Sequence, residues 1–446
     1  MYKSLVRRFC DTAGSGNKML VLSERDVRRS LPLLDCLEIN RKAYISLSNG
    51  MGVVPNRLGL TYPNKFPKNN SSTAKDQSSS PPQAQDWTLI KPAAYYVGDD
   101  DADNINKASK EENEDQLCMG LKVVSVRSNN PSKFGLPLVP ATTILINPST
   151  GIVNATVSAT HLTVARTSAG PALAVQTFQP YAEHLVVFGA GAQAEYHIKL
   201  MQIALQSKYQ RIIPHITIIN RTIENAVKLQ QKLMKDEDVN GKQACAIDVV
   251  ALDDTKGVKE ALKTADIVST TTNSSIPLWS EDDNGGNKSS SSSRLIRPSC
   301  LITSVGSYTP DMAEIPQSVV NRSYVLVDTP EAVHVGDLKH LNVDPSQVLI
   351  NESELDTEKG KNKQQNHHPV ALFGMALADP QCIDIPRGFK LSPKQEHNQD
   401  CDKHNDIGID CIFYKSVGTA IQDVLTTDLV VRRAKSLGIG QQVDMT

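Results

Sequence analysis

Residues 184–200 read HLVVFGAGAQAEYHIKL, in which a run of apolar residues meets a glycine-rich turn and then a helix-forming segment. Gly189 permits a tight turn after the strand, and Gly191 lets the backbone approach a pyrophosphate. Ala194 is small enough for the helix to pack closely on the strand, and the helix N-terminus offers free N–H groups to an anion. The spacing GxGxxA therefore predicts a dinucleotide-binding turn, with Ala192 and Gln193 at the opening of the helix.

Beyond this turn the sequence alternates between strand-like and helix-like segments. Strands are expected at 185–188, 216–220, 245–251 and 267–271, and helices at 192–207, 223–234 and 258–264. Short connections between alternating strands and helices are typical of a parallel, doubly wound sheet. We therefore predict an α/β fold with a Rossmann-type domain.

The end of the second expected strand bears on the choice between nicotinamide cofactors. An acidic residue there would accept a hydrogen bond from the ribose 2′-hydroxyl and would repel a 2′-phosphate, but this chain has Asn220, Arg221 and Thr222. A guanidinium and a hydroxyl suit a phosphate, so NADP(H) is favoured, with NAD(H) as the alternative. In the competing interpretation Arg221 only faces solvent and Thr222 caps the next helix.

The N-terminal half has a different pattern. An apolar stripe with helical spacing runs through residues 23–50 and is interrupted by Pro32, which predicts two helices. Strands are expected at 119–126, 142–147 and 152–158, the last two joined by an Asn-Pro-Ser-Thr-Gly turn into a hairpin, and an alanine-rich helix at 162–176.

Composition narrows the class of protein. The 446 residues include 47 basic and 49 acidic side chains, a net charge of −2 that argues against nucleic-acid binding by bulk electrostatics. No apolar run is long enough to span a bilayer. The eight cysteines have no zinc-site spacing, so we interpret them as reduced thiols of an intracellular, cytoplasmic protein. The basic first residues leave organelle targeting as a minority alternative.

Polar segments interrupt both halves of the chain. They are rich in Asn, Ser, Gln and acidic residues and cannot contribute to a core, so we expect disordered insertions near 66–115, 281–294, 351–368 and 394–406. The remaining residues are enough for two domains.

Several stretches taken together resemble the ornithine cyclodeaminase/mu-crystallin family, which includes ketimine reductases and some alanine dehydrogenases. They occur in family order: VVPNRLGL at 53–60, GLKVVSV at 120–126, ATTILINPSTG at 141–151, LTVARTSAGPALA at 162–174, VVFGAGAQAEYH at 186–197, INRT at 219–222, ADIVSTTT at 265–272, VGSYTPDMAEI at 305–315 and YKSVGTAIQD at 414–423.

The resemblance implies a Rossmann domain plus a discontinuous α+β domain for substrate binding and dimerisation. The expected boundaries are a flexible N-terminus at 1–18, the substrate-binding domain at 19–180, the nucleotide-binding domain at 181–415, and a C-terminal helix at 416–446 that returns to the dimerisation domain. A homodimer follows from the resemblance, as do Thr271 and Val305 as further cofactor-binding residues.

Substrates of the family are small amino or imino acids, which require a clamp for a carboxylate. Arg57 and Arg166 match the family's carboxylate-binding arginines, and a planar guanidinium can hold a carboxylate through two parallel hydrogen bonds. From the residues alone, a surface position is the favoured interpretation of each arginine.

Lys122 lies in an otherwise apolar strand and matches the family's catalytic lysine. A partly buried lysine has a lowered pKa and can exchange a proton with the substrate nitrogen; the alternative is a strand-edge lysine with its ammonium in solvent. Thr142 matches a substrate-contacting threonine, although strand threonines often only pack.

The chain differs from the cyclodeaminases of this family at one position that matters for the reaction. Cyclodeaminases carry a catalytic aspartate at the position of Tyr308, and a phenol with a pKa near 10 cannot replace a carboxylate base at neutral pH. Lys415 is of the mu-crystallin type, where cyclodeaminases tend to have an acid. Asp311 is the nearest substitute and our second catalytic candidate.

The leading hypothesis is therefore an NAD(P)H-dependent reductase of cyclic ketimine carboxylates. The alternatives are ornithine cyclodeaminase, which converts ornithine to proline and ammonia, and a non-catalytic protein that binds NADP(H) or a small ligand. His184, His197 and the pair His367-His368 are interpreted as structural or solvated residues, and no metal site is expected.

Overall fold

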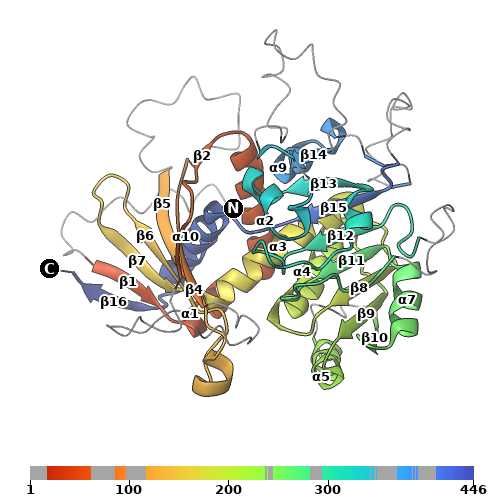
Figure 1. Ribbon diagram of the computed structural model, residues 1–446. Helices are drawn as coiled ribbons and strands as arrows, with labels where there is room; N and C mark the ends of the chain where they lie inside the picture. The colour runs from red at the N-terminus through yellow and green to blue at the C-terminus, as the bar shows by residue number, and fades with distance from the viewer. Residues whose placement is uncertain are drawn as a thin grey trace, which may run out of the picture. The chain divides into compact units, whose positions relative to one another are not determined.

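The computed structural model divides the chain into two compact units (Figure 1). Unit 1 comprises residues 1–31, 53–162 and 423–446, and unit 2 comprises residues 32–52 and 163–422. The structure describes residues 18–61, 86–96, 117–236, 239, 245–281, 294–341, 343–345, 348, 369–383, 385–386, 388–389 and 408–445. The expected flexible N-terminus and most of the expected insertions lie outside the described residues. The expected disordered insertion near 66–115 is wrong in part, because Trp87–Tyr96 forms a strand within it.

Unit 2 contains an eight-stranded sheet in the order β10-β9-β8-β11-β12-β15-β13-β14. Its strands are β8 (His184–Phe188), β9 (His215–Asn220), β10 (Ala246–Ala251), β11 (Ile267–Thr270), β12 (Leu301–Ser304), β13 (Ser323–Val327), β14 (Val370–Leu372) and β15 (Cys411–Lys415). All neighbouring strands are parallel. The expected Rossmann-type sheet is confirmed.

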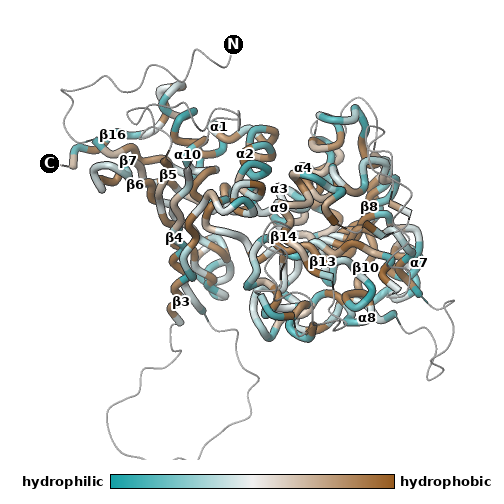
Figure 2. Tube along the Cα trace, turned by 90° about the horizontal axis from the view of Figure 1, so that it is seen from above, coloured by the Kyte–Doolittle hydropathy of each residue, from teal (hydrophilic) through white to brown (hydrophobic). Residues whose placement is uncertain are grey.

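Helices alternate with these strands as the sequence predicts. They are α3 (Thr160–Phe178), α4 (Ala192–Tyr209), α5 (Ile223–Leu233), α7 (Thr255–Thr264), α8 (Gln317–Val320) and α9 (Phe373–Ala378). Every residue of β8 is buried, which is typical of a parallel strand that is covered on both faces. Figure 2 shows the hydrophobic residues concentrated in the sheet of this unit and hydrophilic residues along α7.

Unit 1 contains the second sheet, in the order β16-β1-β7-β6-β5-β4-β2, with β3 paired to β4. Its strands are β1 (Lys18–Leu22), β2 (Gly52–Val53), β3 (Leu58–Thr61), β4 (Trp87–Tyr96), β5 (Leu117–Val126), β6 (Ala141–Ile146), β7 (Val153–Ser158) and β16 (Gln441–Asp444). β6 and β7 form the expected antiparallel hairpin. The helix α1 (Glu24–Ser30) and most of α10 (Ala420–Ser436) complete the unit.

Pro32 separates α1 from α2 (Leu33–Ser48), as its missing N–H predicts. The two helices then belong to different units, because α2 packs on α4 and α9 of unit 2. The segment 32–52, which the sequence analysis placed in the substrate-binding half, therefore belongs to unit 2, the unit of the parallel sheet.

Two of the histidines have structural roles in unit 2. The ring of His184 lies between the hydroxyls of Thr264 and Thr217, each at 2.9 Å. His197 of α4 is fully buried and contacts Ser269 Oγ through Nδ1 at 2.9 Å. Burial lowers the pKa of His197 to about 3 and that of His184 to about 4.

The buried His197 is expected to make the stability of unit 2 depend on pH. Its folded pKa is below the unfolded value near 6.5, so the unfolded state takes up the proton first as pH falls, and stability that is complete above pH 6.5 is lost progressively below it. For His197→Gln, which stays neutral and can still contact Ser269, the loss between pH 7 and pH 5 should be smaller by about 2 kcal/mol. Urea unfolding at both pH values measures this difference, and equal losses in the two proteins would contradict it.

None of the helices in the described part of the chain combines the length and the apolar character that crossing a membrane requires.

Candidate functional site

The carboxyl ends of four neighbouring strands of unit 2 lie in one row. The register pairs Phe188 of β8 with Thr270 of β11, Thr270 with Ser304 of β12, and Ser304 with Lys415 of β15. Each of these residues is the last of its strand. Because ligands of open parallel sheets bind just beyond the carboxyl ends of the strands, this edge is where a cofactor site is expected.

Three of the expected cofactor-binding residues follow directly on these strand ends: Gly189, Thr271 and Val305. Gly189 has a φ of +114°, and a Cβ at this position would lie 2.5 Å from Thr271 Oγ1. Thr271 Oγ1 donates a hydrogen bond to the backbone oxygen of Phe188 at 2.9 Å. Glycine is therefore required at position 189 both by the backbone conformation and by the close approach of β11.

The beginning of α4 provides space in front of its first N–H groups. Gly191 is the N-cap and is exposed, and a Cβ there would have no heavy atom within 4 Å. Ala192 is also exposed, Ala194 is fully buried, and Gln193 Oε1 accepts a hydrogen bond from Ser168 Oγ at 3.3 Å. An open helix N-terminus directly after a buried strand fits a ligand that carries a pyrophosphate.

The turn after β9 holds the residues that bear on cofactor preference. Asn220 Nδ2 donates to the backbone oxygen of Thr222 at 2.8 Å, which fixes the turn, and Arg221 is exposed. Thr222 is the N-cap of α5, but its side chain makes no capping hydrogen bond. The capping role in the competing interpretation of this segment is therefore not observed.

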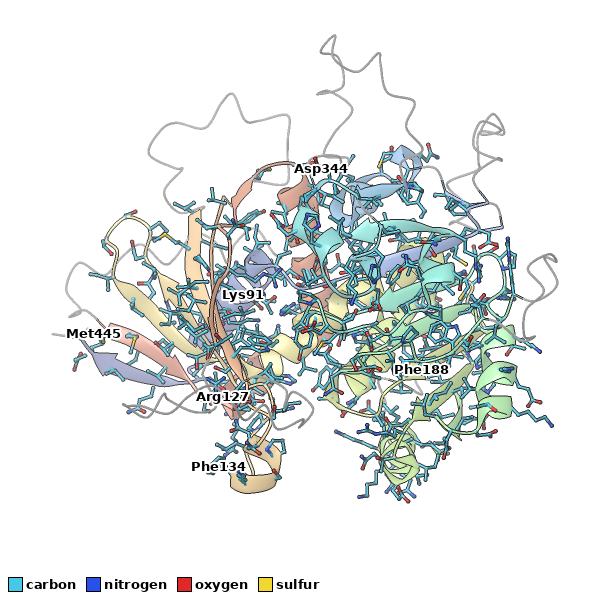
Figure 3. All side chains as sticks on the ribbon, in the orientation of Figure 1. Lys91, Arg127, Phe134, Phe188, Asp344 and Met445 are labelled. Atoms are coloured by element: carbon cyan, nitrogen blue, oxygen red, sulfur yellow. The ribbon has the colours of Figure 1, made fainter. Side chains whose placement is uncertain are left out.

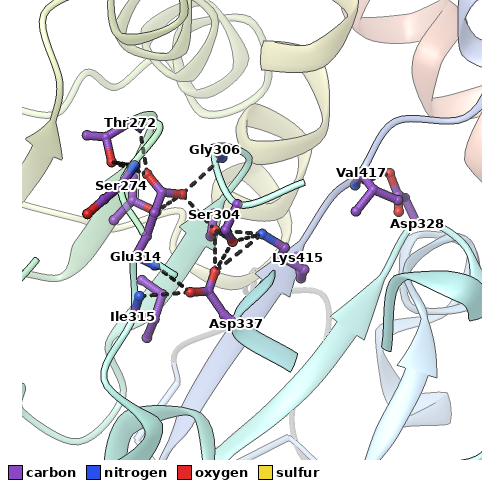
Figure 4. A network of polar contacts seen from close by, with 12 residues as sticks. Thr272, Ser274, Ser304, Gly306, Glu314, Ile315, Asp328, Asp337, Lys415 and Val417 are labelled. Atoms are coloured by element: carbon purple, nitrogen blue, oxygen red, sulfur yellow. Dashed lines mark hydrogen bonds and ion pairs between the residues drawn. The ribbon is translucent and has the colours of Figure 1, made fainter. Parts of the chain in front are cut away.

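A buried carboxylate connects the ends of β11 and β12 (Figure 4). Glu314 is fully buried, and its Oε2 accepts hydrogen bonds from Thr270 Oγ1 (2.9 Å), Ser304 Oγ (3.0 Å) and the backbone N–H of Gly306 (2.9 Å). Its Oε1 accepts from the N–H and hydroxyl of Thr272 at 2.6 and 2.8 Å. Burial raises the pKa of Glu314. These contacts hold the loops that begin at Thr271 and Val305 in fixed positions.

A second buried carboxylate extends this network to β15. Asp337 Oδ1 accepts from the backbone N–H groups of Glu314 (2.6 Å) and Ile315 (3.0 Å), and Oδ2 lies 2.9 Å from Ser304 Oγ and pairs with Lys415 Nζ (3.3 Å). Burial acts to raise the pKa of Asp337, but the Lys415 ammonium and the hydrogen bonds outweigh it and hold the pKa below its ordinary value. Lys415 is completely buried, so its charge is committed to this network.

Tyr308 and Asp311 follow in the loop after β12. Tyr308 is partly buried, and burial raises the pKa of its phenol, so the side chain is neutral at physiological pH and is no substitute for a carboxylate base. Asp311 is exposed, and its catalytic role remains a prediction.

Arg166 lies in α3 and is 5% exposed. Gln422 Nε2 donates to its backbone oxygen at 3.3 Å. Its guanidinium lies directly against Gly418, where a Cβ would approach Nη1 to 2.5 Å. Gly418 has a φ of +77°, and its N–H donates to Asp328 Oδ2 at 2.6 Å. From the residues alone Arg166 was expected at the surface, but the structure buries it, and the neighbouring turn leaves room for its guanidinium.

The most unusual feature of unit 1 is a group of three buried charges. Lys122 of β5 is completely buried, and its Nζ lies 2.6 Å from Asp423 Oδ1. Lys91 of β4 lies 3.0 Å from the other oxygen, Oδ2, of the same carboxylate (Figure 3). The alternative interpretation, in which Lys122 lies at a strand edge with its ammonium in solvent, is therefore wrong. We name these three residues the lysine–aspartate cluster.

The strand register decides which threonine shares a face with Lys122. Lys122 is paired with Thr143 and Val123 with Thr142, and side chains directly opposite each other in antiparallel strands point to the same face. Thr143 is fully buried, whereas Thr142 is exposed. The structure thus brings Thr143 to the lysine–aspartate cluster and does not bring Thr142 there.

Thr142 instead lines an open cavity of about 450 Å³ on the other face of the sheet, together with Glu24 and Ser158. Arg57 is partly buried and lies between β2 and β3. Of the predicted substrate-binding residues, Arg57, Lys122 and Thr142 belong to unit 1 and Arg166 belongs to unit 2.

The sequence analysis gave no role to several residues that the structure makes prominent. Asp423 ends the YKSVGTAIQD segment, and its only local signal is that it is the acidic residue in the first turn of α10. Lys91 had a clearer signal, since it is the single charge in the strand WTLIKPAAYY. Glu314 and Asp337 had none, because nothing local indicates which backbone groups a carboxylate will meet.

The sequence model of the ornithine cyclodeaminase/mu-crystallin family matches residues 105–380 of this chain. An uncharacterized cyclodeaminase of Dictyostelium discoideum is 27% identical over 438 residues, which cover 96% of this chain and all of the relative. A Δ1-pyrroline-2-carboxylate reductase of Bacillus cereus (strain ZK / E33L) is 26% identical over 331 residues, 73% of this chain and 81% of that protein.

Solved structures confirm the fold. The Δ1-pyrroline-2-carboxylate reductase of Thermococcus litoralis, solved in complex with NADH and L-proline, superposes with a TM-score of 0.63. The comparison covers 95% of this chain and all of that one, at 22% sequence identity.

Proposed function

Because the chain belongs to the ornithine cyclodeaminase/mu-crystallin family, we propose that it is an NAD(P)H-dependent reductase of cyclic imino acid carboxylates. The observation that carries the proposal is the completely buried Lys122, whose ammonium is held 2.6 Å from Asp423. An ammonium fixed by a carboxylate is well suited to deliver a proton to a developing amine. The matching Δ1-pyrroline-2-carboxylate reductases support imine reduction as the reaction class.

Each residue has a defined task in this proposal. Lys122 donates the proton that the imine nitrogen requires, and Asp423 positions its Nζ. Arg57 and Arg166 bind the substrate carboxylate, which fixes its orientation. Thr142 is omitted from the proposal because its side chain points away from Lys122.

The cofactor is expected along the strand ends of unit 2. The first turn of α4 would hold the pyrophosphate, since Gly189 and Gly191 leave it space, and Thr271 and Val305 would border the nicotinamide half. When bound, the reduced nicotinamide supplies the hydride. Glu314 keeps the loops at Thr271 and Val305 in place, which is a positioning role.

The direct test is the loss of NADPH or NADH absorbance when purified protein receives Δ1-pyrroline-2-carboxylate or Δ1-piperideine-2-carboxylate. We expect cofactor consumption with these imines and no ammonia from ornithine with the oxidised cofactor, because Tyr308 replaces the aspartate of cyclodeaminases. Release of ammonia and proline from ornithine would make the protein a cyclodeaminase. Binding of NADPH without turnover of either imine or of ornithine would support a binding protein instead.

We further propose that NADP(H) is the preferred cofactor, through Arg221. An exposed guanidinium after β9, in a turn that Asn220 holds in place, can pair with a 2′-phosphate. Replacing Arg221 with alanine should raise the KM for NADPH about tenfold. Steady-state kinetics with both cofactors measures this effect, and NADH should be unaffected because it lacks the phosphate. If Arg221→Ala leaves the ratio of the KM values for NADPH and NADH unchanged, Arg221 does not select NADP(H).

A further inference from the structure

The proposed reaction needs one lysine, but the site contains two. Lys91 is 5% exposed and Lys122 is completely buried, and both contact the carboxylate of Asp423. Burying an ammonium is costly even when it is paired. The strand register places Lys91 directly opposite Lys122, so their side chains point to the same face of the sheet. A proton donor placed by Asp423 does not require this second charge.

The polar row continues into the next strand. Thr143 of β6 is paired with Lys122, so Lys91, Lys122 and Thr143 form one row across β4, β5 and β6. Thr143 is fully buried, and its Oγ1 has no hydrogen-bond partner among the described residues. This buried hydroxyl can form a hydrogen bond with a further group at the row.

The chemistry of the row defines that group. Two ammonium groups and a hydroxyl supply hydrogen-bond donors, and donors of positive charge select an anion. Lys91 is the most exposed of the three residues and lies on the side of the row toward β2 and β3. Because Lys91 lies opposite Lys122 on the same face, a substrate whose imine nitrogen contacts Lys122 can extend a substituent toward Lys91.

We propose that Lys91 determines substrate specificity by binding a second carboxylate, so that the preferred substrates are imine dicarboxylates rather than monocarboxylates. This inference rests on the proposed imine reduction. Asp423 then has two functions: it positions Lys122 for proton donation, and it holds Lys91 at the substrate. The carboxylate on the imine carbon remains the ligand of the arginines, whereas the additional carboxylate meets Lys91.

A matched pair of substrates tests the proposal. Δ1-Piperideine-2-carboxylate and Δ1-piperideine-2,6-dicarboxylate differ by one carboxylate, and we expect the natural protein to have the higher kcat/KM for the dicarboxylate. Replacing Lys91 with methionine should lower the ratio of the two kcat/KM values about ten- to a hundredfold, the effect of losing one charged hydrogen bond. Lys18→Met is the control, because Lys18 is an exposed lysine of β1, three strands away from β5.

The outcomes separate the two possible roles of Lys91. Equal losses with both imines would mean that Lys91 only supports Asp423 and Lys122, and a natural preference for the monocarboxylate would also overturn the proposal. If neither imine is reduced, the proposed function fails, but Lys91 can still be tested by calorimetry in the presence of NADP⁺. Pipecolate and piperidine-2,6-dicarboxylate are the probes, and tighter binding of the dicarboxylate that is lost in Lys91→Met would support the specificity role.

Discussion

Replacing Lys122 with methionine is expected to lower kcat for cyclic imine reduction about a hundred- to ten-thousandfold, the range that a positioned proton donor contributes. Methionine has a similar length but cannot donate a proton. The dissociation constant for NADPH, measured by fluorescence, should stay unchanged because the proposed pyrophosphate contacts come from the first turn of α4 and not from Lys122. The variant should also fold, since Asp423 keeps Lys91 as an ion-pair partner.

Two comparisons make the Lys122 experiment decisive. Lys18→Met removes an exposed lysine of the same unit and should leave kcat unchanged. Asp423→Asn retains Lys122 but weakens the contact that positions it, so kcat should fall while the KM for the imine changes less. Unchanged turnover in Lys122→Met would eliminate the proposed proton donor.

Replacing Lys415 with methionine is expected to destabilise unit 2 by about 3 to 5 kcal/mol, because removing one partner of a buried ion pair leaves the other charge uncompensated. Asp337 would keep its contacts with Ser304 and with two backbone N–H groups but would lose its ammonium partner. The unfolding transition in urea or on heating measures the loss.

A double variant distinguishes the unpaired charge from lost packing. Lys415→Met combined with Asp337→Asn removes both charges and retains an acceptor for Glu314 and Ile315, so it should be more stable than Lys415→Met alone. The deficit of Lys415→Met should also shrink as pH falls toward 4. Protonation of Asp337 relieves the unpaired charge in the variant over this range, whereas the natural protein, in which the pKa of Asp337 is lowered, loses the contribution of this group only below about pH 4. A deficit below about 1 kcal/mol at pH 7 would contradict the ion-pair argument.

Much of the fold could be predicted because its signals are local. The turn from Gly189 to Ala194 lies within one strand–helix connection, and Pro32 separates two helices by a property of its own ring. The burial of Arg166 was not predicted from the residues alone, because an arginine is usually exposed and its tertiary surroundings are not visible in the sequence. The register of the parallel strands then showed why Gly189, Thr271 and Val305, far apart in the chain, follow one continuous sheet edge.

The sequence by itself determined the α/β class, the nucleotide turn, the β6–β7 hairpin and Lys122 as the candidate proton donor, since each depends on neighbouring residues or on family motifs. Only the tertiary structure joined Lys91 and Lys122 to Asp423. Asp423 follows Lys91 by 332 residues and Lys122 by 301 residues in the chain. The tertiary structure also showed that Thr143, and not Thr142, shares a face of the sheet with Lys122. The physical reason is that side chains alternate between the two faces of a strand, so an error of one residue, invisible in a motif, moves a side chain to the opposite face.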